Sequence, residues 1–434
     1  MSGRRVAYLN VRLLDPASGL DAPGGLLVDD GVIADLGPEL TGGGLADDIE
    51  LVDCGGRVLC PGLIDMRVFS GEPGAEHKET LASLGQAAAA GGVTTAVTMP
   101  NTEPVIDNVA LVEYVARRAR ETAAVRVLPT AAISQRLEGQ AMTELGLMAE
   151  AGAVAFSDGD RAVANALVMR RVLSYASTFG LLIVQYPEEP ALARDGVMNE
   201  SEVAMRLGLP GIPACAETVM IERDLRLVEL TGGRYHAALV STRAAIAALR
   251  TAKANGLPVS AAAAPHNFAL NETAVGDYRT FAKTDPPLRG EDDRRALAEG
   301  LADGTVDVIC SSHTPEDAES KRLPFEQAAS GIIGLETLLP LALELYHNGN
   351  LGLPELIAKM TINPARHLGL PTGRLAAGAP ADLLVFDPDV PWRIDEDRFR
   401  SKSKNSPFDG RPVQGRVWRT IVGGACVYDQ TGEA

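Results

Sequence analysis

The sequence is poor in cysteine and in aromatic residues, and each shortage excludes a class of protein. The five cysteines are odd in number, scattered, and form no CxxC pair, so they indicate neither a disulfide framework nor a thiolate zinc site. Aromatic residues make up only 4% of the chain, so the core has to be built mainly from aliphatic side chains on helices and buried strands. A small β-sandwich alone does not fit this composition.

Basic residues and long apolar runs are scarce as well. Lysine and arginine number 40 against 57 aspartates and glutamates, which gives a formal net charge of −17. The summed field repels phosphate backbones and anionic lipid surfaces, so we expect neither nucleic acid nor a membrane as a partner. No run of about 18 apolar residues occurs, and the start of the chain alternates like a strand instead of showing the apolar stretch of a signal peptide. We therefore expect a cytoplasmic protein.

Length and composition indicate a folded protein of two or three domains. Hydrophobic residues make up 46% and charged residues 22% of the 434 residues. At roughly 150 residues per domain the length suggests about three domains, although an α/β barrel can hold about 250 residues as one unit. The two ends of the chain, from Val6 to about Val58 and from Gly373 to Gln430, show short strands separated by Gly and Pro turns. They could form one small sheet domain.

The middle of the chain, from about Pro61 to Leu370, alternates short aliphatic runs with helical stretches. This alternation is typical of a parallel sheet with helices between its strands. The eight strand candidates are residues 63–68, 94–100, 125–133, 153–158, 181–186, 234–242, 258–265 and 306–313. Eight such strands close into a (β/α)8 TIM-like barrel, whose active site lies at the carboxyl ends of the strands.

We therefore examined the residues that end each run for metal-binding and catalytic groups. These residues are Arg67, Phe69, Asn101, Asp158, Gln185, Leu239, His266, Ser312 and His313. A hydrolytic metal site needs three or more ligands from His, Asp, Glu or Cys that converge on one cavity, and only Asp158, His266 and His313 qualify. The remaining histidines lie inside a strand or in helical and loop contexts: His77, His236, His347 and His367. The usual binuclear site cannot be assembled from this set.

Each of the surviving candidates also has a structural interpretation. Asp158 could be a ligand or base, but an aspartate before glycine is more often a turn or helix-capping residue. His313 could be a ligand or base, or simply a hydrogen-bonded histidine at the barrel mouth. Arg67 could bind an anion or pair with Asp158. A triad of Ser311 or Ser312 with His313 is a weak hypothesis, because adjacent residues on an extended strand point to opposite faces.

Several long segments identify a family resemblance that covers essentially the whole chain. The sequence closely resembles dihydroorotases of the amidohydrolase superfamily in PGLIDMRVFSGEPG, AGAVAFSDGD, LGLPGIPACAETVMIERDL, TDPPLR and INPARHLGLPTGRLAAGAPADLLVFD. The resemblance implies an α/β fold with a barrel over residues 59–370. It also implies a small β-sandwich domain assembled from both termini, residues 1–58 plus 371–434.

The residues that the family uses for chemistry are replaced. The family expects an HxHxR motif, with two metal-binding histidines and a substrate-binding arginine, where this chain has Arg67, Phe69 and Gly71. Two further histidine ligands are expected at Gln185 and Leu239. Five expected functional groups are therefore absent from these two regions.

The last motifs of the family depart in the same way. Where a DHAPH loop supplies a proton-accepting aspartate and a substrate-binding histidine, this chain has Ser312 and Glu316, and the asparagine expected before PPLR is Asp285. Only Asp158, which matches a ligand aspartate, and Asn101, which matches a substrate-binding asparagine, remain.

The resemblance with these departures predicts a dihydroorotase-like pseudoenzyme of pyrimidine biosynthesis that binds no zinc and has no confident catalytic residue. Noncatalytic homologues of this kind hold aspartate transcarbamoylase in a mixed assembly, so we expect that partner and a homo- or hetero-oligomer. We also expect Arg67 to replace the metal charge beside Asp158. Two alternatives remain: an enzyme with altered chemistry that uses Arg67, Asp158, His266 and His313, and an active dihydroorotase or other cyclic amidohydrolase.

Overall fold

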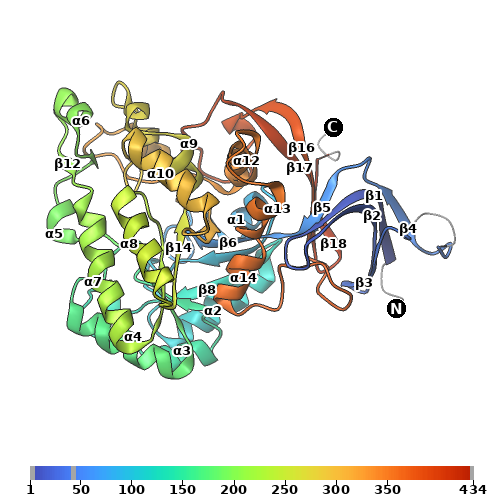
Figure 1. Cartoon of the computed structure of the whole chain (residues 1–434), viewed down its shortest axis with the longest axis horizontal. Helices are drawn as coiled ribbons and strands as arrows, with labels where there is room; N and C mark the ends of the chain where they lie inside the picture. Colours follow the sequence, from blue (N-terminus) through green and yellow to red (C-terminus); the bar gives the residue numbers. More distant parts are fainter. Residues whose placement is uncertain (1–4, 41–44, 431–434) are drawn as a thin grey trace.

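The computed structural model of the protein describes residues 5–40 and 45–430. A barrel surrounded by helices occupies one end of the molecule, and a sheet that contains both chain ends occupies the other (Figure 1). Residues 1–4, 41–44 and 431–434, which belong to the predicted terminal domain, lie outside the described residues.

The barrel contains the eight parallel strands predicted from the sequence. In chain order they are β6 (Leu63–Val68), β7 (Val93–Thr98), β8 (Arg126–Ala131), β9 (Ala155–Phe156), β10 (Leu182–Gln185), β13 (Arg234–Ala237), β14 (Val259–Ala263) and β15 (Val308–Ile309). They pair in this order from β6 to β15, and a parallel bridge between Val68 and His313 joins the first strand to the segment after the last. The prediction of a (β/α)8 barrel is therefore confirmed.

Helices follow most of the barrel strands and lie around the barrel (Figure 1). They are α1 (Leu81–Ala90), α2 (Val109–Thr122), α3 (Leu145–Glu150), α4 (Ala166–Phe179), α5 (Pro190–Ala193), α6 (Glu202–Leu207), α7 (Cys215–Thr231), α8 (Arg243–Ala254), α9 (Pro265–Ala269), α10 (Glu291–Ala302), α11 (Ala318–Arg322), α12 (Leu338–His347), α13 (Leu353–Ala358) and α14 (Ile362–Leu368). Local sequence fixes their ends: Thr80 caps α1 in a capping box with Ser83, and Gly180 ends α4 in the left-handed conformation. Over the described ranges, none of these helices is long and apolar enough to span a bilayer.

Short elements complete the chain, all of them in the barrel part except η5, which lies between two strands of the terminal sheet. Strands β11 (Met198–Asn199) and β12 (Gly211–Ile212) form a small parallel pair. The 3₁₀ turns are η1 (Gln135–Leu137), η2 (Glu272–Val275), η3 (Thr280–Ala282), η4 (Leu335–Thr337) and η5 (Glu396–Arg398).

Both chain ends contribute to one terminal sheet, as the sequence predicts. Its strands are β1 (Arg5–Asp15), β2 (Leu20–Asp29), β3 (Val32–Gly37), β4 (Glu50–Asp53), β5 (Val58–Pro61), β16 (Leu383–Arg393), β17 (Pro412–Val422) and β18 (Ala425–Asp429). The antiparallel pairing of β5 with β16 joins the two ends, and bulges in β1, β16 and β17 interrupt the ladder. The predicted domain limits, 1–58 with 371–434 and 59–370, remain predictions, and β5 carries the sheet to Pro61.

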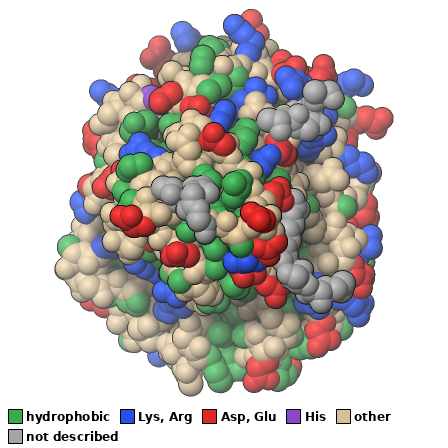
Figure 2. Space-filling view, turned by 90° about the vertical axis from the view of Figure 1, so that its right-hand side faces the viewer, with side chains coloured by type: hydrophobic (Ala, Val, Ile, Leu, Met, Phe, Trp, Pro, Cys, Tyr) green, Lys and Arg blue, Asp and Glu red, His purple; other side chains and the backbone are tan. Residues whose placement is uncertain are grey.

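The hydrophobic core follows this division. The largest apolar cluster lies between the barrel strands and their helices and is mainly aliphatic, with Ile183 and Leu249 among its buried members. A second cluster is built from both termini, for example Leu26 with Leu383. On the face of the molecule nearest the terminal sheet, acidic and basic side chains are interspersed with small groups of hydrophobic side chains (Figure 2). The negative net charge is therefore not gathered into one block on that face.

Candidate functional site

The barrel strands are parallel, so their carboxyl ends meet at one mouth. The nine positions that end the predicted strand runs lie at a strand end or in the segment that follows it. These positions are Arg67 near the end of β6 and Phe69 after it, Asn101 after β7, Asp158 after β9, Gln185 at the end of β10, Leu239 after β13, His266 in the short helix α9 that follows β14, and Ser312 with His313 after β15.

Arg67 is almost fully buried, with only 3% of its surface exposed. Its Nη1 atom donates a hydrogen bond to the carbonyl oxygen of Gly159 at 3.0 Å. The guanidinium carbon lies 5.0 Å from the centre of the Phe69 ring and 5.4 Å from that of the Tyr186 ring, distances at which a cation is attracted to an aromatic face. Arg67 therefore reaches across the mouth from β6 to the loops after β9 and β10.

The predicted ion pair between Arg67 and Asp158 is not formed. Asp158 is buried, but its Oδ1 accepts a hydrogen bond from the backbone N–H of Ser134 at 2.9 Å, and its Oδ2 accepts one from the Ser134 hydroxyl at 2.5 Å. Burial raises the pKa of Asp158 to about 6, and the hydrogen bonds from Ser134 oppose this rise. The expectation that Arg67 supplies charge to Asp158 is wrong because Ser134 already satisfies the carboxylate.

Two of the replaced ligand positions lie in an apolar environment. Leu239 is a buried member of the cluster that also contains Met66 and Val184, and Phe69 packs against the same cluster. Gln185 is fully buried, and its Oε1 accepts a hydrogen bond from the backbone N–H of Val163 at 3.2 Å. None of these three side chains directs a free carboxylate or imidazole into the mouth.

His313 makes contacts typical of a structural histidine. It is fully buried, and its Nδ1 accepts a hydrogen bond from the backbone N–H of Gly334 at 3.1 Å. Its Nε2 lies 3.5 Å from Oε2 of Glu79. The Ser311 hydroxyl accepts from the backbone N–H of His313, and Ser312 adopts a left-handed conformation at φ 49°. Since the imidazole contacts neither serine hydroxyl, the triad considered from the sequence is not assembled.

His266 and the amides of Asn101 and Asn267 are among the unsatisfied buried polar groups at the strand ends, together with Nε of Arg67, Nε2 of Gln185 and Nε2 of His313. Burial lowers the pKa of His266 to about 3, so its ring is neutral at ordinary pH. Neither ring nitrogen of His266 hydrogen-bonds to a described residue, nor do the side-chain amide atoms of Asn267 or the amide oxygen of Asn101. Buried polar atoms of this kind bind a polar group more readily than the satisfied residues around them.

Tyr186, which sequence reasoning did not assign, and Asp285, which it noted only as a replaced asparagine, lie close to Arg67, and the unassigned Glu188 interacts with both of them. The Tyr186 hydroxyl makes a short hydrogen bond with Oδ1 of Asp285. Burial and the neighbouring carboxylate raise the pKa of Glu188, and burial raises that of Asp285, which the Arg67 charge opposes. Two features of the sequence could have identified this group. Tyr186 directly follows Gln185, and Asp285 stands where the family has an asparagine.

Further carboxylates missed from the sequence hold the loops at the strand ends. Asp65 accepts hydrogen bonds from the backbone N–H groups of Ser311 and Arg67, each at 3.1 Å. Glu217 accepts from the backbone N–H groups of Ser241 and Thr242, each at 3.0 Å. Burial raises the pKa of Asp65 to about 6. A charged residue inside an otherwise apolar run, as in LIDMRV, is the signal that could have identified Asp65.

These contacts do not fit a zinc site. Within residues 5–40 and 45–430, no three His, Cys, Asp or Glu side chains are grouped so that they could hold a metal ion. A catalytic zinc ion takes about three strong protein ligands, and a guanidinium at position 67 adds a positive charge where a cation would have to bind. Of the four residues of the altered-chemistry hypothesis, Asp158 bonds to Ser134, His313 lies beside Glu79 and Arg67 bonds to Gly159, so that hypothesis stays a prediction.

A cavity of about 300 Å³ opens beside the mouth. The loops that follow β8, β9 and β10 line it, and they contribute Asp160, Arg161, Tyr186 and Glu188. This space is large enough for a small molecule, and its charged lining is mainly acidic.

Comparison with known proteins relates the chain to one enzyme family over nearly its whole length. A family model described as Dihydro-orotase-like matches residues 56–245, and one described as Amidohydrolase family matches residues 344–428. A protein named dihydroorotase from Anaplasma phagocytophilum (strain HZ) is 45% identical over 427 residues, covering 98% of this chain and 95% of the relative. A dihydroorotase from Syntrophus aciditrophicus (strain SB) is 44% identical and covers 96% and 98% of the two chains.

Solved structures show the same architecture. L-Hydantoinase (dihydropyrimidinase) from Arthrobacter aurescens superposes with a TM-score of 0.88 at 25% identity, covering 99% of this chain and 97% of that one. Dihydropyrimidinase from Brevibacillus agri NCHU1002 superposes with a TM-score of 0.85 at 21% identity, covering 98% and 95% of the two chains. The barrel and the terminal sheet together are thus a known arrangement.

Proposed function

Because the chain belongs to the dihydroorotase family of the amidohydrolase superfamily, we propose that it is a noncatalytic member of that family with a structural role in pyrimidine biosynthesis. In this role it holds aspartate transcarbamoylase in a mixed assembly. One observation carries the proposal: the buried guanidinium of Arg67 lies in the mouth, packed on Phe69 and Tyr186. The partner is inferred from the resemblance to noncatalytic homologues.

The chemistry of the family explains why the donor set matters. Hydrolysis of a cyclic amide needs a strong nucleophile and a group that stabilises the developing oxyanion, and a bound metal supplies both by polarising water and the carbonyl. Phe69, Gln185 and Leu239 offer no imidazole for that metal, and Ser312 offers no carboxylate as a base. The two retained residues, Asn101 and Asp158, provide one amide and one carboxylate that is already bonded to Ser134.

The second candidate function is dihydroorotase activity itself, the interconversion of carbamoyl-aspartate and dihydroorotate. The names of the relatives at 44–45% identity favour it over the noncatalytic interpretation. In that case a ligand set other than the family's would have to operate at the mouth, where the unsatisfied atoms of His266, Asn267 and Asn101 are among the available groups.

Metal content and turnover distinguish the two functions. We expect the purified protein to contain no stoichiometric zinc and to interconvert carbamoyl-aspartate and dihydroorotate no faster than a blank, with the Syntrophus aciditrophicus relative assayed in parallel as the positive control. One or two tightly bound metal ions per chain together with turnover would establish the second function instead.

Restoring the two histidines of the HxHxR motif tests whether the ligand positions have been assigned correctly. We expect the Arg67→His, Phe69→His double variant to remain inactive with zinc added, because positions 185, 239 and 312 still lack their groups and catalytic residues act as a unit. Substantial turnover of this variant would show that the ligand positions have been assigned wrongly.

The structural role needs its own experiment. We expect the chain and the aspartate transcarbamoylase of the same organism, co-expressed and separated by size-exclusion chromatography, to elute as one complex with a fixed stoichiometry. Transcarbamoylase that elutes at the same position with and without this chain would disprove the assembly, while leaving the metal and turnover results untouched.

A further inference from the structure

An exposed apolar strip lies on the outer surface of the neighbouring helices α3 and α4, on the side of the barrel away from the terminal sheet (Figure 1). Leu147 on α3 is 51% exposed, and on α4 Leu167 is 52%, Tyr175 37% and Phe179 56% exposed. Large apolar side chains that gather in water indicate an interaction surface, whereas single ones are ordinary. We call the exposed surface of residues 144–150 and 166–179 the α3–α4 face.

Contacts between the two helices show that the apolar strip is continuous. The rings of Tyr175 and Phe179 pack with their centres 5.0 Å apart. The Tyr175 hydroxyl lies against α3, where a Cβ added to Gly146 would be 2.8 Å from it. Leu167, Arg171 and Tyr175 follow one another at intervals of four residues, which places them along one side of α4.

The composition of the α3–α4 face is that of a protein–protein interface. Aromatic residues make up only 4% of the chain, yet two exposed ones lie together here. Over residues 5–40 and 45–430, Tyr278 is the one other aromatic side chain exposed to this degree. The face contains two arginines and no lysine. Interfaces are enriched in aromatic residues and arginine and depleted of lysine.

Charges of opposite sign are separated between the two helices. Glu144, which precedes α3, and Glu150, at its end, are exposed three positions before and after Leu147. Arg170 and Arg171 are exposed on α4, a helix that contains no acidic residue. None of these four charged side chains makes a hydrogen bond or an ion pair with another described residue. The face therefore has an acidic half and a basic half.

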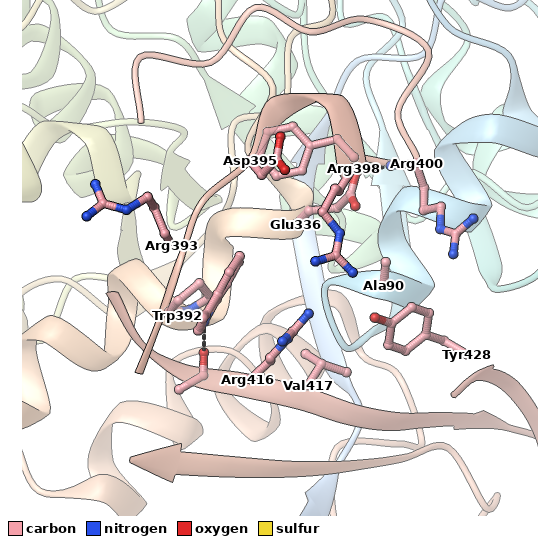
Figure 3. A pocket seen from close by; sticks show the side chains of 13 residues that line it. Ala90, Glu336, Trp392, Arg393, Asp395, Arg398, Arg400, Arg416, Val417 and Tyr428 are labelled. Carbon is pink, nitrogen blue, oxygen red and sulfur yellow. Dashed lines mark hydrogen bonds between the residues drawn. The ribbon is translucent and has the colours of Figure 1, made fainter. Parts of the chain in front are cut away.

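Arginine in a hollow elsewhere on the molecule is already held by its own chain. In the cavity between the barrel and the terminal sheet, the Arg416 guanidinium lies over the Trp392 ring at 5.4 Å, and Nε1 of Trp392 donates to the carbonyl oxygen of Gly415 at 2.8 Å (Figure 3). The side-chain oxygen of Gln430 accepts hydrogen bonds from Nε and Nη1 of Arg416 at 2.9 and 3.0 Å. Arg170 and Arg171 have no such contacts with described residues, so their charges are available to a partner.

We propose that the α3–α4 face is the contact between two copies of this chain related by a two-fold axis. Such an axis sets the same surface of both copies against itself, so the acidic α3 of each copy meets the basic α4 of the other. The two apolar strips then cover one another, and the charges around them gain partners of opposite sign. An unrelated partner requires no such balance of the two signs on adjacent helices.

The contact uses no residue of the mouth, and it goes beyond the proposed function because the chain forms it without transcarbamoylase. Sedimentation velocity of the purified full-length chain alone therefore tests it. We expect a dimer whose Kd rises with ionic strength, because part of the contact is made by exposed charges that salt screens.

Charge reversal tests which surface the dimer uses. Arg170→Glu, Arg171→Glu makes both helices acidic, so we expect the Kd to rise by about tenfold or more, since like charges placed opposite one another repel. The matched control is Arg206→Glu, Arg366→Glu, which makes the same change in net charge at exposed arginines of α6 and α14. The control should dimerise as the wild type does.

A compensating variant separates repulsion at the contact from damage to the fold. Adding Glu144→Arg and Glu150→Arg to the Arg170→Glu, Arg171→Glu chain restores the net charge and reverses both halves of the face. We expect this quadruple variant to dimerise with a Kd close to that of the wild type, because the acidic helix of one copy again meets the basic helix of the other. A reversal that acts by unfolding the chain is not rescued in this way.

Truncating the aromatic pair tests the apolar strip. We expect Tyr175→Ala, Phe179→Ala to raise the Kd by about tenfold or more, because aromatic side chains contribute much of the binding energy at interfaces. A chain that stays monomeric at every protein concentration would overturn the proposal, as would a dimer whose Kd none of these variants changes.

The same variants show whether a different partner covers the α3–α4 face. If the chain alone is monomeric and the Arg170→Glu, Arg171→Glu reversal abolishes co-elution with aspartate transcarbamoylase, the face belongs to that enzyme and the proposal is wrong. A dimer that the reversal weakens, in a chain that forms no complex with transcarbamoylase, supports this contact and disproves the assembly. Failure of the one is therefore distinguishable from failure of the other.

Discussion

The wall of the barrel and its mouth are stabilised by different interactions: apolar burial in the wall, and hydrogen bonds to buried charged groups at the mouth. Every residue of β6, β7, β10 and β14 is buried, and most are aliphatic, so the wall gains its stability from apolar burial. The mouth, at the carboxyl ends of the same strands, contains buried charges: Asp65 and Arg67 are in β6 itself, and Asp158 follows β9. Their partners are mainly backbone groups and neighbouring side chains of the same chain.

This difference explains how a family fold persists when its ligands change. The apolar packing of the wall does not depend on side-chain contacts at the mouth, so substitutions at the strand ends leave the barrel intact. The mouth then has to satisfy its own buried polar groups, and hydrogen bonds from Ser134 and Ser311 to aspartates do so. In this chain the carboxylates at the strand ends hold loops in position.

The largest effect we expect concerns the wall. Ile64→Ala in β6 removes a fully buried side chain from the cluster that lines the barrel interior, and such a cavity costs about 4 kcal/mol of unfolding free energy. Leu230→Ala on α7, where the side chain is 62% exposed, is the control and should change the stability by no more than about 0.5 kcal/mol. Urea unfolding measures both, and similar losses for the two variants would contradict the picture of a wall stabilised by burial.

The next effect concerns the buried charge of the mouth. The cost of about 3–5 kcal/mol for breaking a buried ion pair does not apply to Arg67, because the pair with Asp158 is not formed. Arg67→Met still removes the hydrogen bond to Gly159 and the contacts with Phe69 and Tyr186, so we expect a loss of about 2 kcal/mol.

The unfolding free energy of Arg67→Met, measured with urea, is compared with that of the control Arg226→Met. The control changes an exposed arginine, and its unfolding free energy should lie within about 0.5 kcal/mol of the wild-type value. An unchanged stability of Arg67→Met would mean that the guanidinium is incidental to the mouth. A loss as large as that of Ile64→Ala would mean that mouth and wall are not separate in energetic terms.

Much of the fold was predictable because it depends on periodic patterns. The alternation of apolar runs and helical stretches gave all eight barrel strands, and the turn-rich ends gave the terminal sheet. What periodicity could not give was the continuity of that sheet. The pairing of β5 with β16 joins residues more than 300 positions apart in the chain, and no local signal encodes such a contact.

The site was less predictable, because partners at the mouth are set by side-chain direction in three dimensions. Sequence reasoning found Arg67 and Asp158 and paired them by charge. In the structure Asp158 instead accepts hydrogen bonds from Ser134, an uncharged residue that a search for charged partners does not identify. The hydrogen bond between Tyr186 and Asp285 joins two loops about 100 residues apart and was missed for the same reason.

The smallest effect, and the most specific, is the pH dependence of stability that Asp158 imposes. Burial raises the pKa of the folded-state carboxyl from its ordinary value of 3.8 to about 6. Between about pH 4 and pH 6 the native protein keeps a proton that the unfolded chain has lost, so unfolding releases that proton and stability falls as the pH rises. Asp158→Asn cannot titrate. Its stability relative to the wild type should therefore increase over this interval by about 2 kcal/mol and stay constant above it.

Ser134→Ala sharpens this test, because the hydrogen bonds from Ser134 lower the pKa of Asp158 and the variant removes the one donated by the hydroxyl. The pKa of Asp158 should rise further in Ser134→Ala, and the interval over which stability falls should move to higher pH. Carbon-13 NMR titration of the aspartate carboxyl gives the pKa directly, and urea unfolding at several pH values gives the stability. If Asp158 instead titrates below pH 4 in both proteins, a positive group stabilises its charged form. The charge of Arg161 already lowers the pKa of Asp158, so the same titration in Arg161→Gln and in Arg67→Met would show which arginine is responsible, and only an effect of Arg67→Met would restore the predicted ion pair.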